Sequence, residues 1–185
     1  MEKSILFAGF GGQGVQTLGK LLAYAANEEK KYVTFSPAYG GEMRGGTSNC
    51  TVIVSDRQIG SPTRERLDMV VAMNIESFRR FEPQVKPGGL LICNDSLIPL
   101  KTERKDITQV NIPANELALE AGSDKTLNVI MLGFIAAHYD LVSKEAAEKI
   151  VEEKLGKKEK FRAMNQKAFI LGANYDAGTA DLGNK

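Results

Sequence analysis

The stretch from Ser4 to Ala26, SILFAGFGGQGVQTLGKLLAYAA, constrains the fold of this chain more than any other. Its first apolar run, Ile5–Ala8, is too short for a core helix and stops at the glycine-rich segment Gly9–Gly14. Apolar residues then recur at spacings that place them on one face of a helix: Val15, Leu18, Leu21, Leu22, Ala25 and Ala26. A strand, a glycine turn and a helix in this order predict the opening unit of a nucleotide-binding α/β fold.

The glycine turn predicts an anion site, because glycines allow close backbone approach and the unpaired N–H groups of a helix start attract negative charge. Gly9, Gly11 and Gly14 fit G-x-G-x-x-G. No Lys-Ser or Lys-Thr follows, which excludes a triphosphate P-loop. The acidic residue of a dinucleotide site is missing about 20 residues later, where the chain reads Ser36-Pro37. A dinucleotide, another anionic ligand, or a turn needed only for packing all remain open.

Composition and charge are those of an ordinary soluble globular domain. Lys and Arg number 24 against 23 Asp and Glu, so no net field attracts nucleic acid or an anionic membrane. No stretch approaches the roughly 18 apolar residues of a membrane span, and the start of the chain does not resemble a signal peptide. We therefore expect a cytoplasmic protein without nucleic-acid or membrane partners.

Residues suited to catalysis or metal binding are few. Cys50 and Cys93 are too few and too far apart for a zinc site or an iron–sulfur cluster of their own, and we expect both to be buried free thiols in strands. The single histidine, His138, lies near the end of an apolar helix, where we expect a packing role. No catalytic residue and no metal site are predicted on this chain.

The remaining sequence alternates strands with helices. Strands are predicted at 32–36, 48–55, 68–73, 90–93 and 107–112, and helices at 75–81, 113–120, 127–138, 144–155 and 161–171. A turn is predicted at Lys86–Gly89, and an irregular loop at 95–106. This order predicts an α/β fold: a three-layer α/β/α sandwich, Rossmann-like, with a mostly parallel central sheet. We expect one domain over residues 1–172 and a polar C-terminal tail over 173–185.

A second glycine-rich segment, Tyr39–Ser48 (YGGEMRGGTS), falls in a loop predicted over residues 37–47. Both glycine segments follow strands, so we expect them to form one site beyond the carboxyl ends of the sheet. Two glycine pairs there flank Glu42 and Arg44. Arg44 either presents its guanidinium to a carboxylate or phosphate, or pairs with a neighbour while the glycines only allow sharp turns.

Together these motifs resemble the gamma subunit of 2-oxoacid:ferredoxin oxidoreductases, a module that also occurs as an internal domain of single-chain pyruvate:ferredoxin oxidoreductases. The resemblance is carried by GFGGQGV at 9–15 and YGGEMRGGTS at 39–48, and it continues through Asp68–Asn74, Lys86–Gly89 and Asn165–Gly172. It covers nearly the whole chain up to the tail.

The resemblance implies a division of labour within a hetero-oligomeric enzyme. The family oxidatively decarboxylates a 2-oxoacid such as 2-oxoglutarate, pyruvate or a branched-chain oxoacid, reduces ferredoxin and forms acyl-coenzyme A. Thiamine diphosphate and the iron–sulfur clusters are then expected on partner alpha, beta and ferredoxin-like delta subunits, and none on this chain. The gamma module is associated with coenzyme A binding and subunit assembly.

The same resemblance implies two groups of binding residues. Gly11, Gly12, Gln13 and Gly14 are expected to bind one anionic part of coenzyme A. The second group, which is expected either to line the other side of the cleft or to contact a partner subunit, consists of Tyr39, Arg44, Gly45, Gly46 and Thr47. Two rival interpretations stay open: a free-standing dinucleotide-dependent oxidoreductase, and a docking subunit whose glycine loops touch only protein.

Overall fold

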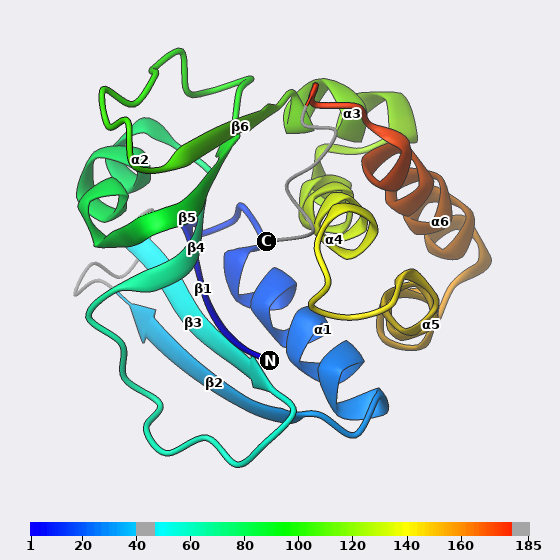
Figure 1. Ribbon diagram of the computed structural model, residues 1–185. Coiled ribbons are helices and arrows are strands. Elements are labelled where there is room, and N and C mark those ends of the chain that lie inside the picture. The colour runs from blue at the N-terminus through cyan, green and yellow to red at the C-terminus, as the bar shows by residue number, and fades with distance from the viewer. Residues whose placement is uncertain (40–46, 179–185) are drawn as a thin grey trace.

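The computed structural model describes residues 1–39 and 47–178 and shows a six-stranded sheet in the order β2-β3-β1-β4-β5-β6 (Figure 1). The strands are β1 (Glu2–Phe10), β2 (Tyr32–Tyr39), β3 (Thr47–Ser55), β4 (Leu67–Ala72), β5 (Val85–Asn94) and β6 (Thr108–Ile112). The α-helices are α1 (Val15–Glu28), α2 (Ile75–Phe81), α3 (Ala114–Ala121), α4 (Leu127–His138), α5 (Lys144–Leu155) and α6 (Glu159–Asn174). Short 3₁₀ turns, η1 (Glu82–Gln84) and η2 (Asp124–Thr126), precede β5 and α4.

The sheet is mostly parallel, as the sequence predicts. Strands β1, β4, β5 and β6 pair in parallel, whereas β3 runs antiparallel to both β1 and β2. The register sets Phe10 opposite Thr47, and Tyr39 opposite Ser48. Tyr39 and Thr47, the described residues on either side of 40–46, therefore lie at the edge of the sheet where β1 ends, next to the glycine turn.

Helices cover both faces of the sheet, but unequally. Helices α1, α3, α4, α5 and α6 lie on one face and α2 on the other (Figure 1). Because side chains alternate along a strand, Ile5 and Phe7 of β1 pack in the larger core, and Leu6 and Ala8 pack against the α2 side. This arrangement confirms the α/β class that was predicted from the alternation of strands and helices.

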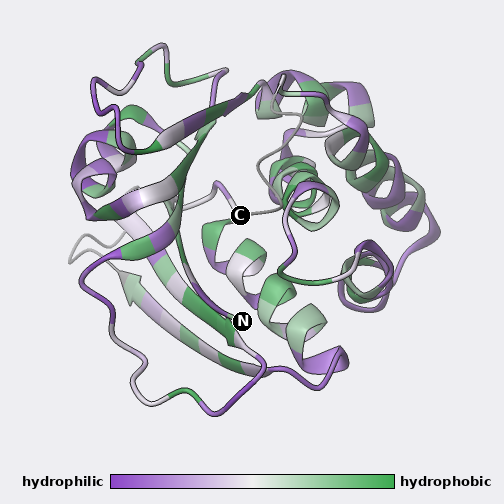
Figure 2. Ribbon diagram, in the orientation of Figure 1, coloured by the Kyte–Doolittle hydropathy of each residue, from purple (hydrophilic) through white to green (hydrophobic). Residues whose placement is uncertain are grey.

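Helix α4 forms the centre of the larger core. Its residues from Leu127 to Ala136 are all buried, and Figure 2 shows hydrophobic colouring along it. The helix is apolar nearly all round because α1, α3, α5 and α6 pack around it. None of the described helices is both long enough and apolar enough to cross a membrane.

Several predicted boundaries were wrong. Strand β2 continues to Tyr39, because pairing with β3 extends to Ser48, so residues 37–39 are strand rather than loop. The segment Lys86–Gly89, predicted as a turn, lies inside β5, where it forms an irregularity in the pairing with β4.

The last helix is also longer than predicted. Helix α6 runs from Glu159 to Asn174 and so extends into the tail predicted from residue 173. A Cβ at Gly172 would lie 2.0 Å from the Ile130 carbonyl oxygen, which shows how closely the backbones of α4 and α6 approach there. Packing against α4 continues to Ala173, which is buried. The helix therefore persists where the local sequence becomes polar and glycine-rich.

Candidate functional site

The turn between β1 and α1 requires glycine at two positions. Gly12 has φ +100° and Gly14 has φ +73°, both in the left-handed region that side chains rarely adopt. Gly14 also precedes the first residue of α1, and no described side chain caps this helix. The backbone N–H groups of Val15, Gln16 and Thr17 have no acceptor among the described residues. They form an uncapped, positively polarised helix start.

Gln13 holds this turn in place. Its Oε1 accepts hydrogen bonds from the Phe10 backbone N–H at 2.7 Å and from Asn74 Nδ2 at 3.0 Å. Its Nε2 donates to the Met73 carbonyl at 3.1 Å, and its backbone N–H donates to the Phe10 carbonyl at 3.2 Å. The side chain thus ties the turn to the end of β4.

An open cleft of ≈ 340 Å³ lies against the glycine turn. One wall is formed by Gly12, Gln13, Gly14 and Thr17, and the opposite wall by the segment 123–126 together with Asn128 at the start of α4. Leu155, Phe161, Met164 and Asn165 complete the cleft from the end of α5 and the beginning of α6. The amino ends of α1 and α4 therefore border the same space, and both helix dipoles favour a negatively charged ligand in it.

The second wall of the cleft was not predicted from the sequence. Residues 122–126 stand between the helices predicted at 113–120 and 127–138, and nothing local connects this segment with a turn more than a hundred residues earlier. One signal was available: Asn128 is a strongly polar residue at the second position of an otherwise apolar helix. Such a residue needs a polar partner or a polar opening nearby.

The predicted residues of the second glycine segment are only partly described. Arg44, Gly45 and Gly46 lie outside the described residues. Thr47 begins β3 beside Phe10, and the Tyr39 backbone ends β2. Gly11 is exposed in the turn after β1. The Tyr39 backbone and Thr47 thus lie at the same edge of the sheet as the glycine turn, although Thr47 is not among the described residues that line the cleft.

Gln16, which was not predicted as a site residue, connects α1 to β3 through hydrogen bonds. Its Nε2 donates to the Asn49 carbonyl at 2.7 Å and to Ser48 Oγ at 3.1 Å. This side chain lies on the first turn of α1, so it holds the start of β3 next to the glycine turn. This contact and the β1–β3 register together fix the start of β3 beside the glycine turn.

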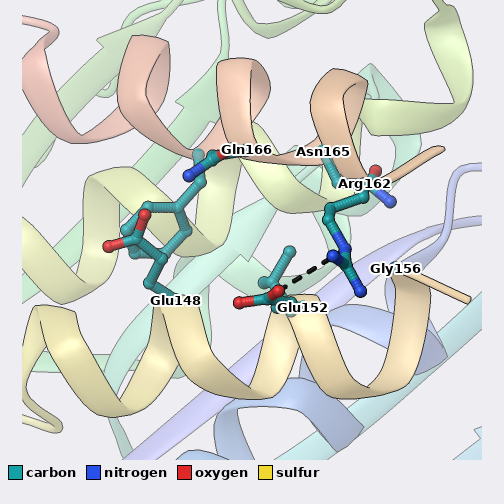
Figure 3. A pocket seen from close by; sticks show the side chains of 8 residues that line it. Glu148, Glu152, Gly156, Arg162, Asn165 and Gln166 are labelled. Carbon is teal, nitrogen blue, oxygen red and sulfur yellow. Dashed lines mark ion pairs between the residues drawn. The ribbon is translucent and has the colours of Figure 1, made fainter. Parts of the chain in front are cut away.

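A second cavity, of ≈ 70 Å³, lies between α5 and α6 (Figure 3). Glu148 and Glu152 of α5 face Arg162 and Gln166 of α6 across it, and Arg162 Nε lies 3.4 Å from Glu152 Oε1. The space is much smaller than the cleft at the glycine turn, and an ion pair between exposed side chains spans its rim. It offers far less room for a ligand.

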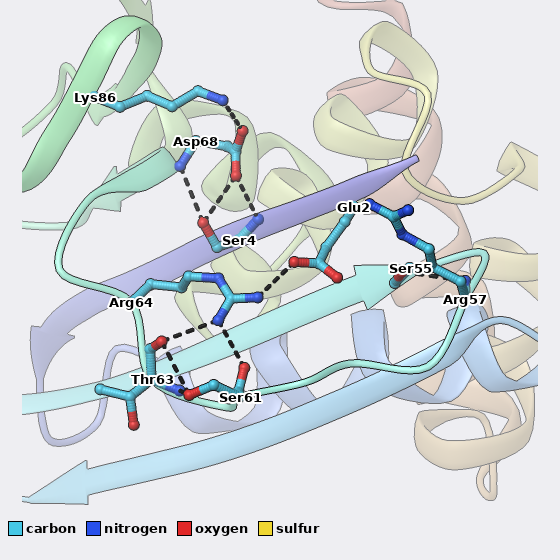
Figure 4. Close-up of polar contacts among 9 residues, drawn as sticks. All are labelled: Glu2, Ser4, Ser55, Arg57, Ser61, Thr63, Arg64, Asp68 and Lys86. Carbon is cyan, nitrogen blue, oxygen red and sulfur yellow. Dashed lines mark hydrogen bonds and ion pairs between the residues drawn. The ribbon is translucent and has the colours of Figure 1, made fainter.

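A polar cluster lies at the opposite, amino edge of the parallel strands (Figure 4). Asp68 of β4 accepts hydrogen bonds from the Ser4 backbone N–H and hydroxyl, each at 2.8 Å, and from Lys86 Nζ. Burial alone would raise the pKa of Asp68, but the hydrogen bonds from Lys86 and Ser4 and the Lys86 charge outweigh it and lower that pKa below its ordinary value. This cluster ties β4 to β1 and β5 and is structural.

The cysteines and the histidine are placed as predicted. Cys50 and Cys93 are free and buried, and burial raises the pKa of each thiol to about 12. They belong to the cores on opposite faces of the sheet. His138 ends α4 and packs on Phe134 with ring centroids 4.5 Å apart. Within the part of the chain that the structure describes, no three His, Cys, Asp or Glu side chains are grouped to hold a metal ion.

Comparison with known proteins decides the family. The model of the pyruvate ferredoxin/flavodoxin oxidoreductase family matches residues 4–175. The chain belongs to the pyruvate ferredoxin/flavodoxin oxidoreductase family. This confirms the family resemblance that the two glycine segments indicated.

Individual relatives agree with this family. The chain is 33% identical over 175 residues to the ketoisovalerate oxidoreductase subunit VorA of Methanothermobacter marburgensis, covering 94% of this chain but 36% of VorA. It is 31% identical over 160 residues to the 2-oxoglutarate synthase subunit KorC of Methanocaldococcus jannaschii, covering 85% of this chain and 86% of KorC. This chain thus spans about a third of the VorA relatives but most of KorC.

A solved structure supports the same family. The gamma subunit of a keto/oxoacid ferredoxin oxidoreductase from Geobacter sulfurreducens superposes with a TM-score of 0.83 at 30% identity, over 94% of this chain and 95% of that one. The family fold therefore extends over nearly the whole chain.

Proposed function

We propose that this chain is the gamma subunit of a 2-oxoacid:ferredoxin oxidoreductase. Such an enzyme oxidatively decarboxylates a 2-oxoacid, passes the electrons to ferredoxin and transfers the acyl group to coenzyme A. The family match and the relatives named as oxoacid oxidoreductase subunits support this proposal. Since those relatives are named for ketoisovalerate, 2-oxoglutarate and pyruvate, the proposal extends to the 2-oxoacid class and not to one member.

The proposed contribution of this chain is to bind coenzyme A and to assemble with its partners. The observation that carries this role is the cleft bordered by the amino ends of both α1 and α4. Coenzyme A is a polyanion, and uncapped backbone N–H groups at a helix start bind phosphate without any cationic side chain. Arg44, in the segment between β2 and β3, is proposed as a further contact to coenzyme A or to a partner subunit.

Redox chemistry is proposed to take place on partner subunits. Thiamine diphosphate and iron–sulfur clusters, which carry out the decarboxylation and the electron transfer in this proposal, belong on the alpha, beta and delta subunits. The only two cysteines of the chain lie on opposite faces of the sheet and are deeply buried, so they cannot ligate a cluster together. The residues of this chain instead bind and orient the acyl acceptor.

The first experiment is purification by a tag on this chain from its native host. We expect thiamine diphosphate and iron–sulfur clusters to co-purify with it and the complex to form acyl-coenzyme A from a 2-oxoacid. Full activity of the isolated chain, or its recovery without any partner, would contradict the proposal.

The second experiment tests the cleft by calorimetry with coenzyme A on the assembled complex. Thr17 lines the cleft on the first turn of α1, so Thr17→Glu would place a negative charge beside the bound phosphates. We expect coenzyme A affinity to fall about ten-fold or more, because the added carboxylate repels the phosphates. The matched control is Thr63→Glu, on an exposed loop, which should bind like wild type. Unchanged affinity in Thr17→Glu would favour the docking interpretation.

A further inference from the structure

Asn74 fixes the orientation of the Gln13 carboxamide in the glycine turn. Asn74 is 4% exposed and is the N-cap of α2, where its Oδ1 accepts a hydrogen bond from the Ser77 backbone N–H at 2.8 Å. This bond leaves the donor Nδ2 facing Gln13, so Gln13 must present its oxygen there. The Phe10 N–H requires the same oxygen, and the Met73 carbonyl requires the nitrogen. Only one orientation of the Gln13 amide satisfies all three groups.

Gly9 leaves the space that this carboxamide occupies. A Cβ on Gly9 would lie 2.7 Å from Gln13 Oε1 and 2.8 Å from Val15 Cγ2, both closer than real Cβ contacts. Gly9 does not have a positive φ, so its backbone conformation does not require glycine. The first glycine of the G-x-G-x-x-G pattern is therefore needed for space, and part of that space holds the Gln13 amide.

The carbonyl that receives the Gln13 amide is itself held in place. Met73 is fully buried, and its backbone N–H donates to the Ala8 carbonyl at 2.9 Å. Asn94, a side chain with no exposure, has Nδ2 3.5 Å from the Met73 carbonyl and donates to Asn115 Oδ1 at 2.8 Å. Rearranging such enclosed groups would leave buried polar atoms unpaired, which costs free energy. The network therefore holds Gln13 in one position before a ligand binds.

We propose that Asn74 is a positioning residue, which holds Gln13, and through it the glycine turn, in the conformation that binds coenzyme A. This rests on the proposed function that the cleft binds coenzyme A. Asn74 is not among the described residues that line the cleft, whereas Gln13 is, so the effect of Asn74 on binding passes through Gln13. A turn whose N–H groups are already in place binds its ligand without an ordering cost.

Calorimetry with coenzyme A on the purified complex tests this with Asn74→Ser. Serine is a good N-cap, so α2 keeps a capping oxygen, but the new side chain is too short to reach Gln13. We expect coenzyme A affinity to fall about ten-fold while the KM for the 2-oxoacid stays unchanged. The matched control is Ser143→Asn, the reverse exchange at the N-cap of α5, which should bind like wild type. Wild-type coenzyme A affinity in Asn74→Ser would overturn the inference.

A double-mutant cycle separates positioning through Gln13 from an independent structural effect. Gln13→Met removes the three hydrogen bonds of the carboxamide and keeps the length of the side chain. We expect Gln13→Met alone and Gln13→Met combined with Asn74→Ser to lose coenzyme A affinity by the same factor, because Asn74 then has no partner to hold. Losses that multiply in the double variant would overturn the inference, since the two residues would then act separately.

Asn74→Asp provides the same test if the serine variant does not assemble. Aspartate keeps the shape of the side chain and its capping oxygen, but it places a second oxygen against Gln13 Oε1. Coenzyme A affinity should fall here too, and wild-type affinity would overturn the inference. A wild-type complex that does not bind coenzyme A at all would instead contradict the proposed function.

Discussion

At the scale of single residues, the turn between β1 and α1 requires glycine at positions 12 and 14 for different reasons. Gly12 and Gly14 both have positive φ, so any side chain at either position strains the backbone. Their surroundings differ: a Cβ at Gly12 would meet nothing within 4 Å, whereas one at Gly14 would lie 3.1 Å from Asn128 Cβ. The first glycine serves the backbone alone, and the second also allows α4 to pack against the start of α1.

Alanine substitutions at these two glycines should therefore differ in cost. Gly12→Ala should lower the free energy of unfolding by about 1 kcal/mol, because only the left-handed backbone is penalised. Gly14→Ala should lower the free energy of unfolding by about 1 kcal/mol more than Gly12→Ala does, because Asn128 must also shift. Urea denaturation followed by circular dichroism measures both values. Equal losses in the two variants would show that the contact between Gly14 and Asn128 carries no stability.

At the scale of elements, α4 and α6 meet through two glycines. A Cβ at Gly133 would lie 2.3 Å from the Phe169 carbonyl oxygen, and one at Gly172 would lie 2.0 Å from that of Ile130. Both neighbours are backbone atoms, which cannot rotate away. The close crossing of these helices positions the beginning of α6, which carries Phe161 and Met164 to the cleft.

Gly172→Ala should therefore destabilise the protein, although alanine normally favours a helix over glycine by about 1 kcal/mol. We expect the free energy of unfolding to fall by about 2–3 kcal/mol, because α4 and α6 must move apart to make room for the methyl group. Thermal unfolding by calorimetry gives the measurement. Ile170→Ala, at a side chain 46% exposed on the same helix, is the control and should change stability little. A more stable Gly172→Ala would contradict the close crossing.

The hydrogen bonds that Asp68 of β4 accepts from Ser4 of β1 and Lys86 of β5 should make the stability of the fold depend on pH. The pKa of Asp68 is lowered in the folded state, so its carboxylate stabilises the fold at pH values above its ordinary pKa of 3.8. This stabilisation is lost as the pH falls through the lower folded-state pKa. Asp68→Asn should lower the free energy of unfolding by about 2 kcal/mol near neutral pH. The difference from wild type should shrink as pH falls below 3.8, whereas Asp95→Asn, at an exposed site, should differ little at any pH. Denaturation series at several pH values measure this, and a difference that grows toward acid would contradict it.

At the scale of the whole molecule, the sheet separates two cores that each hold one buried thiol. Cys50 packs between β3 and the larger helical layer, and Cys93 packs on the α2 side. Reaching either thiol requires the helices to leave the sheet. The two cysteines therefore report on the opening of the two faces.

Thiol labelling should follow global unfolding on both faces. In single-cysteine variants, Cys93→Ala and Cys50→Ala, the remaining thiol should resist a disulfide reagent at pH 8, because burial raises both pKa values to about 12 and blocks access. Labelling should rise with urea in parallel with the unfolding transition. If Cys93 alone reacted in native buffer, the thin α2 layer would open independently of the rest.

The sequence alone determined the β1–turn–α1 unit, because it follows from local spacing: glycines at Gly9, Gly11 and Gly14, and an apolar face on the next helix. It also indicated the family and the buried cysteines, because motifs and apolar strands are local patterns too. Only the tertiary structure decided that β3 runs antiparallel beside β1, and that Asn128, Phe161 and Lys125 lie opposite the glycine turn. Strand pairing and helix crossing join residues far apart in the chain, so no local pattern encodes them. The turn can be predicted from its own residues, whereas the cleft forms only when α4 and α6 pack beside the turn.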